Sequence, residues 1–241
     1  MLEMFEDKST LGISIGVLVV LITFVILWLL RSKKSTRKNI LLIGASNSGK
    51  TRLFCELVYQ KDALTQISIV PNRGDAVIKD GGKTKTVSLV DIPGQDKVRR
   101  KYFSLYKRSA KAIAFVIDSL SFQKECKDVA QFMYEVLTDE TLSKTKLNFL
   151  IVCHKQDIDL SKGQSFIKAN LEKEIELLRK ISTSALTSTS GSSGEAKSNL
   201  LVKSNDSNKQ FEFSHLKYTN VEFCETSCQN FDPLRNWLLS N

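Results

Sequence analysis

Residues 44–51 form a short glycine-rich stretch of the pattern G-x-x-x-x-G-K-[ST]. A turn of this kind at a helix N-terminus directs bare backbone N–H groups toward an anion. In this pattern Lys50 reaches the β- and γ-phosphates of a nucleotide, and the Thr51 hydroxyl coordinates Mg²⁺. A nucleoside phosphate is therefore the expected ligand. The residues expected to bind it are Gly44, Ala45, Ser46, Asn47, Ser48, Gly49, Lys50, Thr51 and Arg52.

A second motif, Asp91-Ile-Pro-Gly94, follows an apolar run that ends at Val90. A carboxylate at the C-terminal end of a strand can hold Mg²⁺ directly or through a water molecule, and we expect this role for Asp91. Because glycine has no Cβ, the Gly94 N–H can approach a γ-phosphate and sense its presence. The alternative is a surface turn, which fits a position after the phosphate loop and a strand pair less well.

A third motif, His154-Lys-Gln-Asp157, follows the apolar run 147–153 and is similar to the N-K-x-D motif of GTPases. In that motif the aspartate accepts hydrogen bonds from guanine, which predicts guanine selection by Asp157, and the stem of Lys155 covers the base. His154 replaces the usual asparagine and offers one donor and one acceptor, so we expect weaker guanine affinity. A fourth segment, ending in Ser227-Cys228, is similar to the S-A-K loop that contacts guanine O6.

These motifs, in this order, resemble those of Ras-superfamily GTPases, nearest the Arf and Sar branch. The runs 111–119, 122–130, 150–158 and 211–216, together with the apolar N-terminal run, resemble the family of signal recognition particle receptor beta subunits. The resemblance implies GTP/GDP and Mg²⁺ as ligands, and an endoplasmic reticulum membrane location. It also implies a heterodimer in which the alpha subunit docks on the GTP-bound switch surface, with indirect contact to the ribosome and the translocon.

Two further residues take roles from the Ras and Arf resemblance. Ser68 aligns with the switch I threonine that ligates Mg²⁺ in those proteins, and Thr65 is the alternative ligand. Ser68 could also be an ordinary loop serine without a role in metal binding. Gln95 follows Gly94, where the resemblance places a water-orienting catalytic glutamine. Arg99 and Arg100 could act as a cis arginine finger only if the switch folds back. The resemblance thus implies very slow GTP hydrolysis, on the order of 10⁻⁴ s⁻¹.

Residues 11–30 form an uninterrupted apolar run without a charged residue. At about 1.5 Å rise per residue such a helix spans roughly 30 Å, which predicts a transmembrane helix. A cleavable signal peptide fits less well, because the preceding residues are acidic and a basic stretch follows the run. The positive-inside rule then predicts a lumenal tail over 1–10, a basic cytosolic stalk over 31–38 and a cytosolic domain over 39–241. The stalk inflates the net charge of +9, so we expect no direct nucleic-acid binding.

The domain alternates apolar runs typical of strands, among them 39–43, 111–117 and 147–153, with helical patterns. This alternation predicts an α/β fold with a doubly wound, mostly parallel six-stranded sheet, as in P-loop NTPases and small GTPases. Turn residues 80–82 predict an antiparallel hairpin between strands at 76–78 and 85–90. Helices are expected after residue 50 and over 121–138, 165–181 and 232–239. The segment 182–210 is rich in serine and threonine, and we predict that it is a disordered insertion.

Two other functions fit parts of the sequence. An Arf- or Sar-like GTPase that recruits a vesicle coat is one, although Leu2 excludes N-myristoylation and the C-terminus is not a prenylation box. The other is a GTP-locked structural anchor without a hydrolysis cycle, which Gln95 argues against. The reading that best fits the whole sequence is a membrane-anchored GTP-binding receptor subunit for cotranslational protein targeting.

Overall fold

The computed structural model describes residues 16–25, 37–61, 65–80, 82–143, 145–187, 201, 210–217 and 219–241. It divides into two compact units, Met1–Thr36 and Arg37–Asn241. In the first unit, residues 16–25 are helical. Within the described residues, no helix is both long enough and apolar enough to cross a membrane. The other residues of the predicted span 11–30, the tail 1–10 and stalk residues 31–36 lie outside the described part.

The second unit is built on one six-stranded sheet with the order β2-β3-β1-β4-β5-β6. Strands β3, β1, β4, β5 and β6 run parallel to one another, whereas β2 pairs antiparallel with β3. The mostly parallel six-stranded sheet and the antiparallel hairpin are thus as predicted. The strands are β1 Asn39–Gly44, β2 Asn72–Asp80, β3 Lys83–Asp91, β4 Ala110–Asp118, β5 Leu147–His154 and β6 Thr219–Glu225.

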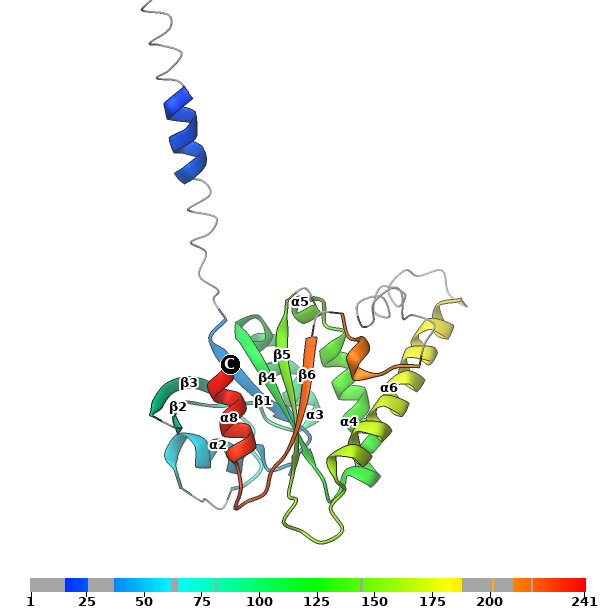
Figure 1. Cartoon of the computed structure of the whole chain (residues 1–241). Helices are drawn as coiled ribbons and strands as arrows, with labels where there is room; N and C mark the ends of the chain where they lie inside the picture. Colours follow the sequence, from blue (N-terminus) through cyan, green and yellow to red (C-terminus); the bar gives the residue numbers. More distant parts are fainter. Residues whose placement is uncertain are drawn as a thin grey trace, which may run out of the picture. The chain divides into compact units, whose positions relative to one another are not determined.

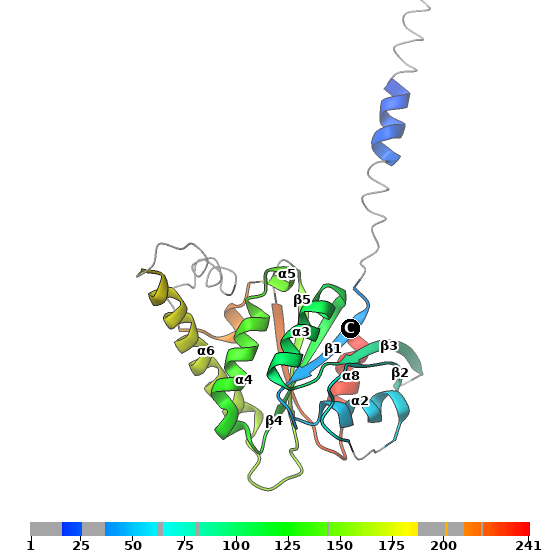
Figure 2. The ribbon, with the colours of Figure 1, turned by 180° about the vertical axis from the view of Figure 1, so that it is seen from behind.

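Helices cover both faces of this sheet (Figures 1 and 2). One face packs against α2 and α8, and the other packs against α3, α4 and α6. The central strands β1, β4 and β5 are buried on both faces, which explains why their sequences are continuous apolar runs. The helices are α2 Lys50–Tyr59, α3 Asp96–Tyr106, α4 Phe122–Leu137, α5 Glu140–Ser143, α6 Gln164–Thr187 and α8 Asp232–Ser240, with 3-10 turns η1 Lys107–Ser109 and η3 Phe213–His215.

Helix α3 was not predicted. Its sequence, Asp-Lys-Val-Arg-Arg-Lys-Tyr-Phe-Ser-Leu-Tyr, is strongly charged and buries only Arg99 and Phe103. A helix with so narrow an apolar stripe has a weak period in the sequence. The helix forms because its few inward side chains pack on α4, as the edge-on contact between Phe103 and Phe132 shows.

The end of α6 corrects the prediction of a disordered segment over 182–210. The helix continues to Thr187 instead of ending near Ile181. Leu201, inside the same segment, is 1% exposed and belongs to the core that covers α4 and α6. Its carbonyl also accepts a hydrogen bond from the Lys217 N–H at 3.3 Å. Residues 188–200 and 202–209 of the predicted insertion lie outside the described residues.

Truncating Leu201 to alanine is expected to lower the free energy of unfolding by about 2–5 kcal/mol, because the change opens a cavity in a packed core. The matched control is Leu177→Ala on α6, where the side chain is 50% exposed and little apolar surface is lost. Urea denaturation of the second unit measures both variants. Equal, small effects at the two positions would show that the Leu201 side chain contributes nothing to the core.

Candidate nucleotide-binding site

The phosphate loop joins the end of β1 to the start of α2 through strained backbone positions that only glycine tolerates well. Gly49, which precedes the first residue of α2, has φ of 91°. A Cβ there would lie 2.4 Å from the His154 ring. Gly44 has φ of 148°, and a Cβ there would lie 2.1 Å from the Val116 carbonyl oxygen. The motif glycines thus allow the loop to pack against the ends of β4 and β5.

Lys50 lies under this loop and is only 5% exposed. Its ammonium donates hydrogen bonds to the Ala45 carbonyl at 2.5 Å and to Ser48 Oγ at 3.1 Å. Burial lowers the pKa of Lys50 to about 8, although the charge of Asp91 acts in the opposite direction. A buried ammonium beside a loop of backbone N–H groups is a cation that a phosphate would stabilise.

Three oxygen-bearing side chains meet next to the loop. The Thr51 hydroxyl donates to Asp91 Oδ2 at 2.8 Å and lies 3.2 Å from Ser68 Oγ. Asn72 Nδ2 donates to the same Asp91 oxygen at 3.0 Å. The sequence did not single out Asn72, because nothing in its surroundings marks it; it comes into place through the pairing of β2 with β3, where it faces Asp91.

The chemistry of this cluster fits a divalent cation. Asp91 is fully buried, and its Oδ1 atom has no hydrogen-bond partner among the described residues. Burial raises the pKa of Asp91, while hydrogen bonds from Asn72 and Thr51 oppose that rise. A buried carboxylate with a vacant lone pair beside two hydroxyl groups offers the hard oxygen ligands that Mg²⁺ prefers. The residues that would hold Mg²⁺ are therefore Thr51, Ser68 and Asp91, the last directly or through water.

Gly94 packs directly against the phosphate loop. A Cβ at this position would lie 2.5 Å from Ser46 N and 2.7 Å from the Ala45 carbonyl oxygen. A backbone N–H can approach the phosphate positions this closely only because the residue is glycine. Gln95 follows as the N-cap of α3, and its carbonyl accepts a hydrogen bond from the Arg99 N–H at 2.7 Å.

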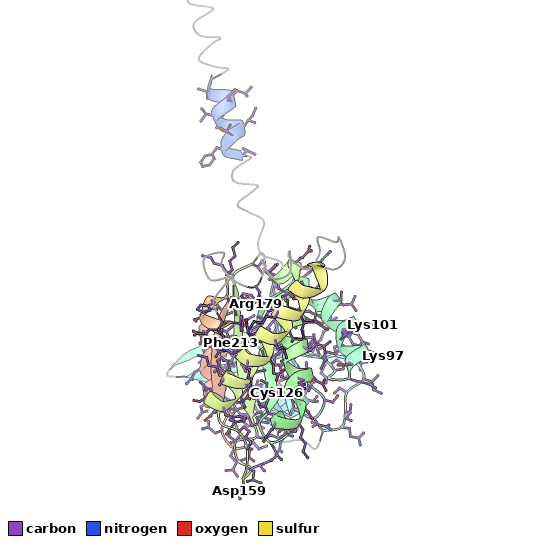
Figure 3. All side chains as sticks on the ribbon, turned by 90° about the vertical axis from the view of Figure 1, so that its right-hand side faces the viewer. Lys97, Lys101, Cys126, Asp159, Arg179 and Phe213 are labelled. Atoms are coloured by element: carbon purple, nitrogen blue, oxygen red, sulfur yellow. The ribbon has the colours of Figure 1, made fainter. Side chains whose placement is uncertain are left out.

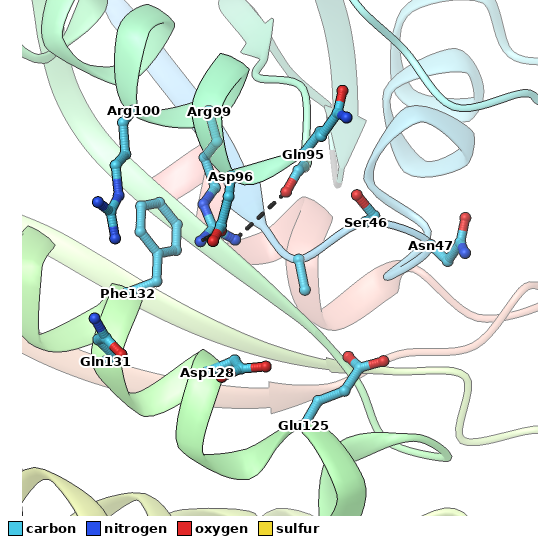
Figure 4. Close-up of a pocket in the computed structure, with 12 residues that line it drawn as sticks. Ser46, Asn47, Gln95, Asp96, Arg99, Arg100, Glu125, Asp128, Gln131 and Phe132 are labelled. Atoms are coloured by element: carbon cyan, nitrogen blue, oxygen red, sulfur yellow. Dashed lines mark hydrogen bonds and ion pairs between the residues drawn. The ribbon is translucent and has the colours of Figure 1, made fainter.

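A cavity of about 440 Å³ lies beside Gly94 and Ser46, between α3 and α4. Figure 4 shows the Gln95 side chain directed away from Asp128 and Glu125 on the α4 side of this cavity. Arg99 is held here by Asp96, by the Phe132 ring at 3.8 Å and by the Gly94 carbonyl at 3.4 Å. Arg100 pairs with Glu135 at 3.0 Å. Both arginines are thus engaged on α3 and α4, in contacts that a cis arginine finger would have to give up.

The base-binding motif lies at the end of β5. Lys155 forms an ion pair with Asp118 at 2.6 Å, at the end of the neighbouring strand β4. Burial acts to raise the pKa of Asp118, but the hydrogen bond and charge of Lys155, together with hydrogen bonds from the backbone N–H groups of Leu120 and Ser121, give a lowered pKa. Asp118 was missed in the sequence, although its place directly after the apolar run 111–117 was a usable signal.

The His154 side chain is 1% exposed and packs between the phosphate loop and the loop after β6. Its Nδ1 atom lies 3.0 Å from Thr226 Oγ1, and its ring stacks on Phe231 with centroids 6.4 Å apart. The opposite edge of the ring faces Gly49. Burial lowers the pKa of His154 to about 4, so the imidazole is neutral near pH 7. The ring therefore connects the base-binding motif to the phosphate loop.

The last segment brings the loop after β6 against the base-binding motif. The Cys228 N–H donates to Asp157 Oδ1 at 3.4 Å. Ser227 Oγ accepts hydrogen bonds from the N–H groups of Gln229 and Asn230, at 3.2 and 3.0 Å, and so shapes the turn. The predicted site residues of all four motifs therefore gather at the carboxyl edge of the sheet. Asp159, in the loop after β5, marks this end of the domain in Figure 3.

A second cavity, of about 320 Å³, opens between the phosphate loop and the segment 65–68. It brings together the positions expected for phosphate, metal and base contacts. Its lining residues are Ser46, Asn47, Gly49, Lys50, Thr51, Arg52, Thr65, Gln66, Ile67, Ser68, Pro93, Gly94 and Lys155. The arrangement can hold a polyphosphate chain along the loop with the base toward Lys155.

Replacing His154 with asparagine is expected to strengthen GTP binding, because a primary amide offers two donors and an acceptor where the neutral ring offers one of each. His154→Ala should weaken binding by roughly tenfold, since the contact with Thr226 is lost and a cavity forms. Fluorescent-nucleotide titration measures both. Equal affinities for wild type, His154→Asn and His154→Ala would show that position 154 does not affect the nucleotide.

The sequence is similar to those of a known protein family. A sequence profile described as signal recognition particle receptor beta subunit matches residues 35–221. The human protein named signal recognition particle receptor subunit beta is 41% identical over 224 residues, which cover 92% of this chain and 80% of that protein.

The fold is also similar to those of solved structures. The structure of the mammalian SRP receptor superposes with a TM-score of 0.69 at 35% identity, covering 84% of this chain and 98% of the other. The SRb-GTP/SRX complex from Chaetomium thermophilum (TM-score 0.61, 21% identity, 85% and 97% covered) shares the fold. So does the small GTPase Arl6 from Trypanosoma brucei, at a TM-score of 0.53 and 15% identity, covering 85% and 96%.

Proposed function

Because this chain belongs to the family of signal recognition particle receptor beta subunits, we propose that it is the membrane-anchored, GTP-binding subunit of that receptor. In this proposal its GTP-bound switch surface tethers the alpha subunit at the endoplasmic reticulum membrane for cotranslational protein targeting. The apolar run 11–30 supplies the single-pass anchor, and the domain 39–241 faces the cytosol. Contacts with the ribosome and the translocon are then indirect, through the alpha subunit.

One observation carries the GTP-binding part. The buried carboxylate of Asp91 lies beside the phosphate loop and Ser68; one of its oxygens accepts from Thr51, and the other has no partner among the residues that the structure describes. When bound there, Mg²⁺ would neutralise part of the charge of the phosphates. The chain's own contribution is to hold Thr51, Ser68 and Asp91 together, while Lys50 holds the β- and γ-phosphates. Asp157 selects guanine over adenine by accepting from the N1–H and the exocyclic amine.

The partner surface is proposed from the segment next to Ser68. Ile67, Ile69 and Val70 are 61%, 69% and 60% exposed, which is unusual for neighbouring large apolar side chains. Contact of a γ-phosphate with Gly94 and Ser68 would order this segment and the start of α3. The alpha subunit would then bury those three apolar side chains, and its capture would therefore depend on GTP. Gln95 orients the attacking water in a slow hydrolysis step.

The test begins with the nucleotide. The second unit, Arg37–Asn241, has its own cores and can be expressed without the N-terminal unit. Denaturing the purified unit and identifying the released nucleotide by chromatography is expected to give a guanine nucleotide. GTP would indicate slow turnover and a standing docking surface, whereas GDP would indicate hydrolysis by the domain. An adenine nucleotide, or none in a folded sample that also fails to bind added GTP, would contradict the proposal.

Capture of the partner tests the second part. The N-terminal domain of the alpha subunit is immobilised, and the Arg37–Asn241 unit is loaded with GTP or GDP. Retention with GTP and loss with GDP is the expected result. Substituting Ile69 and Val70 with serine should abolish retention without changing GTP affinity, because both side chains are exposed and neither lines the nucleotide cavity. Equal retention in both nucleotide states would contradict the switch mechanism.

A further inference from the structure

The edge of the sheet opposite the nucleotide site is rich in lysine and arginine. Because β1, β3, β4, β5 and β6 are parallel, their first residues lie along one edge. Exposed basic side chains flank these starting points. We call the set Lys38, Arg108, Lys111 and Lys146 the basic edge.

The side chains of the basic edge form no ion pair with the residues that the structure describes. The nearby Asp139 is paired instead with Lys107 at 2.5 Å. Lys85, at the beginning of β3, and Lys111 are close enough for the charge of one to act on the other. Like charges gathered at one end of the domain create a positive field there.

The polypeptide enters the domain at this edge. Arg37 donates hydrogen bonds to Thr145 Oγ1 at 2.6 Å and to the Thr141 carbonyl at 3.5 Å. The Lys38 N–H donates to the Ser109 carbonyl at 3.1 Å, and Asn39 Nδ2 donates to Ser109 Oγ at 3.0 Å. These contacts fix the entry point between the starts of β4 and β5, in the middle of the basic edge.

Chain length then limits the distance from the basic edge to the apolar run. Only residues 31–36 separate Arg37 from the run 11–30. An extended chain covers at most about 3.5 Å per residue, so Arg37 lies within roughly 25 Å of the end of that run. If the run spans a bilayer, as proposed above, the basic edge is held within reach of the lipid headgroups.

We propose that the basic edge binds the anionic headgroups of a lipid bilayer and so sets the orientation of the domain on the membrane. Basic residues near an anionic surface each add to the attraction, and the effect is strong only within about a Debye length. Strand β1 has 6 residues, so the phosphate loop lies about 20 Å from this edge. The orientation therefore directs the nucleotide site and the exposed segment 67–70 away from the bilayer, toward a cytosolic partner.

Vesicle flotation of the Arg37–Asn241 unit tests this inference without the anchor. We expect flotation with phosphatidylserine-containing vesicles, none with pure phosphatidylcholine vesicles, and loss at high salt. The variant Arg108→Glu/Lys111→Glu/Lys146→Glu should lower the affinity by roughly a hundredfold or more. It should bind GTP normally, because the nucleotide site is at the other edge.

The matched control is Lys124→Glu/Lys127→Glu/Lys173→Glu, which makes the same charge change at exposed positions on α4 and α6. This control should keep most of the vesicle affinity. Equal losses of vesicle affinity in the two triple variants would show that binding depends only on net charge, and would overturn the inference. A wild-type unit that does not float would overturn it too. Binding of duplex RNA that depends on the basic edge, without binding of anionic vesicles, would overturn it in favour of a nucleic-acid surface. Because the tested unit lacks residues 1–36, a failure of the anchor proposal leaves this result unaffected.

Discussion

Substituting Asp157 with asparagine is expected to lower GTP affinity by at least about a hundredfold, because sites built to hydrogen-bond a substrate group reject a mismatched partner strongly. The carboxylate accepts from the N1–H and the exocyclic amine of guanine, whereas an amide presents a donor to one of them. Asp157 reaches the site from the loop after β5, where the Cys228 N–H holds one of its oxygens at 3.4 Å. Equilibrium titration with labelled GTP measures the loss.

The same variant offers a gain of function that distinguishes base recognition from misfolding. Xanthine carries a carbonyl where guanine carries the exocyclic amine, and the asparagine amide can donate to that carbonyl. Xanthosine triphosphate should therefore bind Asp157→Asn better than GTP does, and restore capture of the alpha subunit. The control Asp159→Asn changes the charge two residues away and should leave the preference for GTP intact. Unchanged GTP affinity in Asp157→Asn would remove Asp157 from the base site.

The second large effect is expected at Lys50. Its replacement with alanine removes a buried cation that would form charge-assisted bonds to the phosphates, a loss of about 2–5 kcal/mol or roughly 30- to 4,000-fold in GTP affinity. GTP-dependent capture of the alpha subunit should disappear with it. The exposed Lys124 on α4 provides the control, because Lys124→Ala removes the same charge outside the site. Circular dichroism and urea denaturation show whether Lys50→Ala is folded.

A pH profile separates the role of Lys50 in binding from a structural role. Burial places the pKa of Lys50 at about 8 in the empty site. A bound phosphate favours the charged form and raises that pKa, so binding above pH 8 takes up a proton and GTP affinity should fall as the pH rises. Below that pH the ammonium is already charged and this contribution is constant. Lys50→Ala should lose the decline above pH 8, and a decline of equal size in the variant would assign it to another group.

Local patterns in the sequence predicted much of the fold. The apolar runs 39–43, 111–117 and 147–153 predict buried parallel strands because both of their faces are covered, and β1, β4 and β5 occupy those places. Residues 80–82 predict the hairpin between β2 and β3. Helix α3 escaped prediction because its inward face consists of only a few residues, one of them the arginine Arg99. The sequence did not predict the continuation of α6 or the burial of Leu201. In a serine-rich segment, a single apolar residue does not give any sequence window a hydrophobic pattern.

The sequence by itself determined the chemistry available to this protein, since the phosphate loop, Asp91-Ile-Pro-Gly94 and His154-Lys-Gln-Asp157 depend on residues that are neighbours along the chain. Tertiary structure alone decided which distant groups complete each motif. Asn72 beside Asp91, Asp118 beside Lys155 and Thr226 beside His154 meet across strands. The entry of the chain at the basic edge was decided in the same way. Such contacts depend on strand order and register, which set the distances between residues far apart in sequence. The spacing of residues along the chain therefore does not predict them.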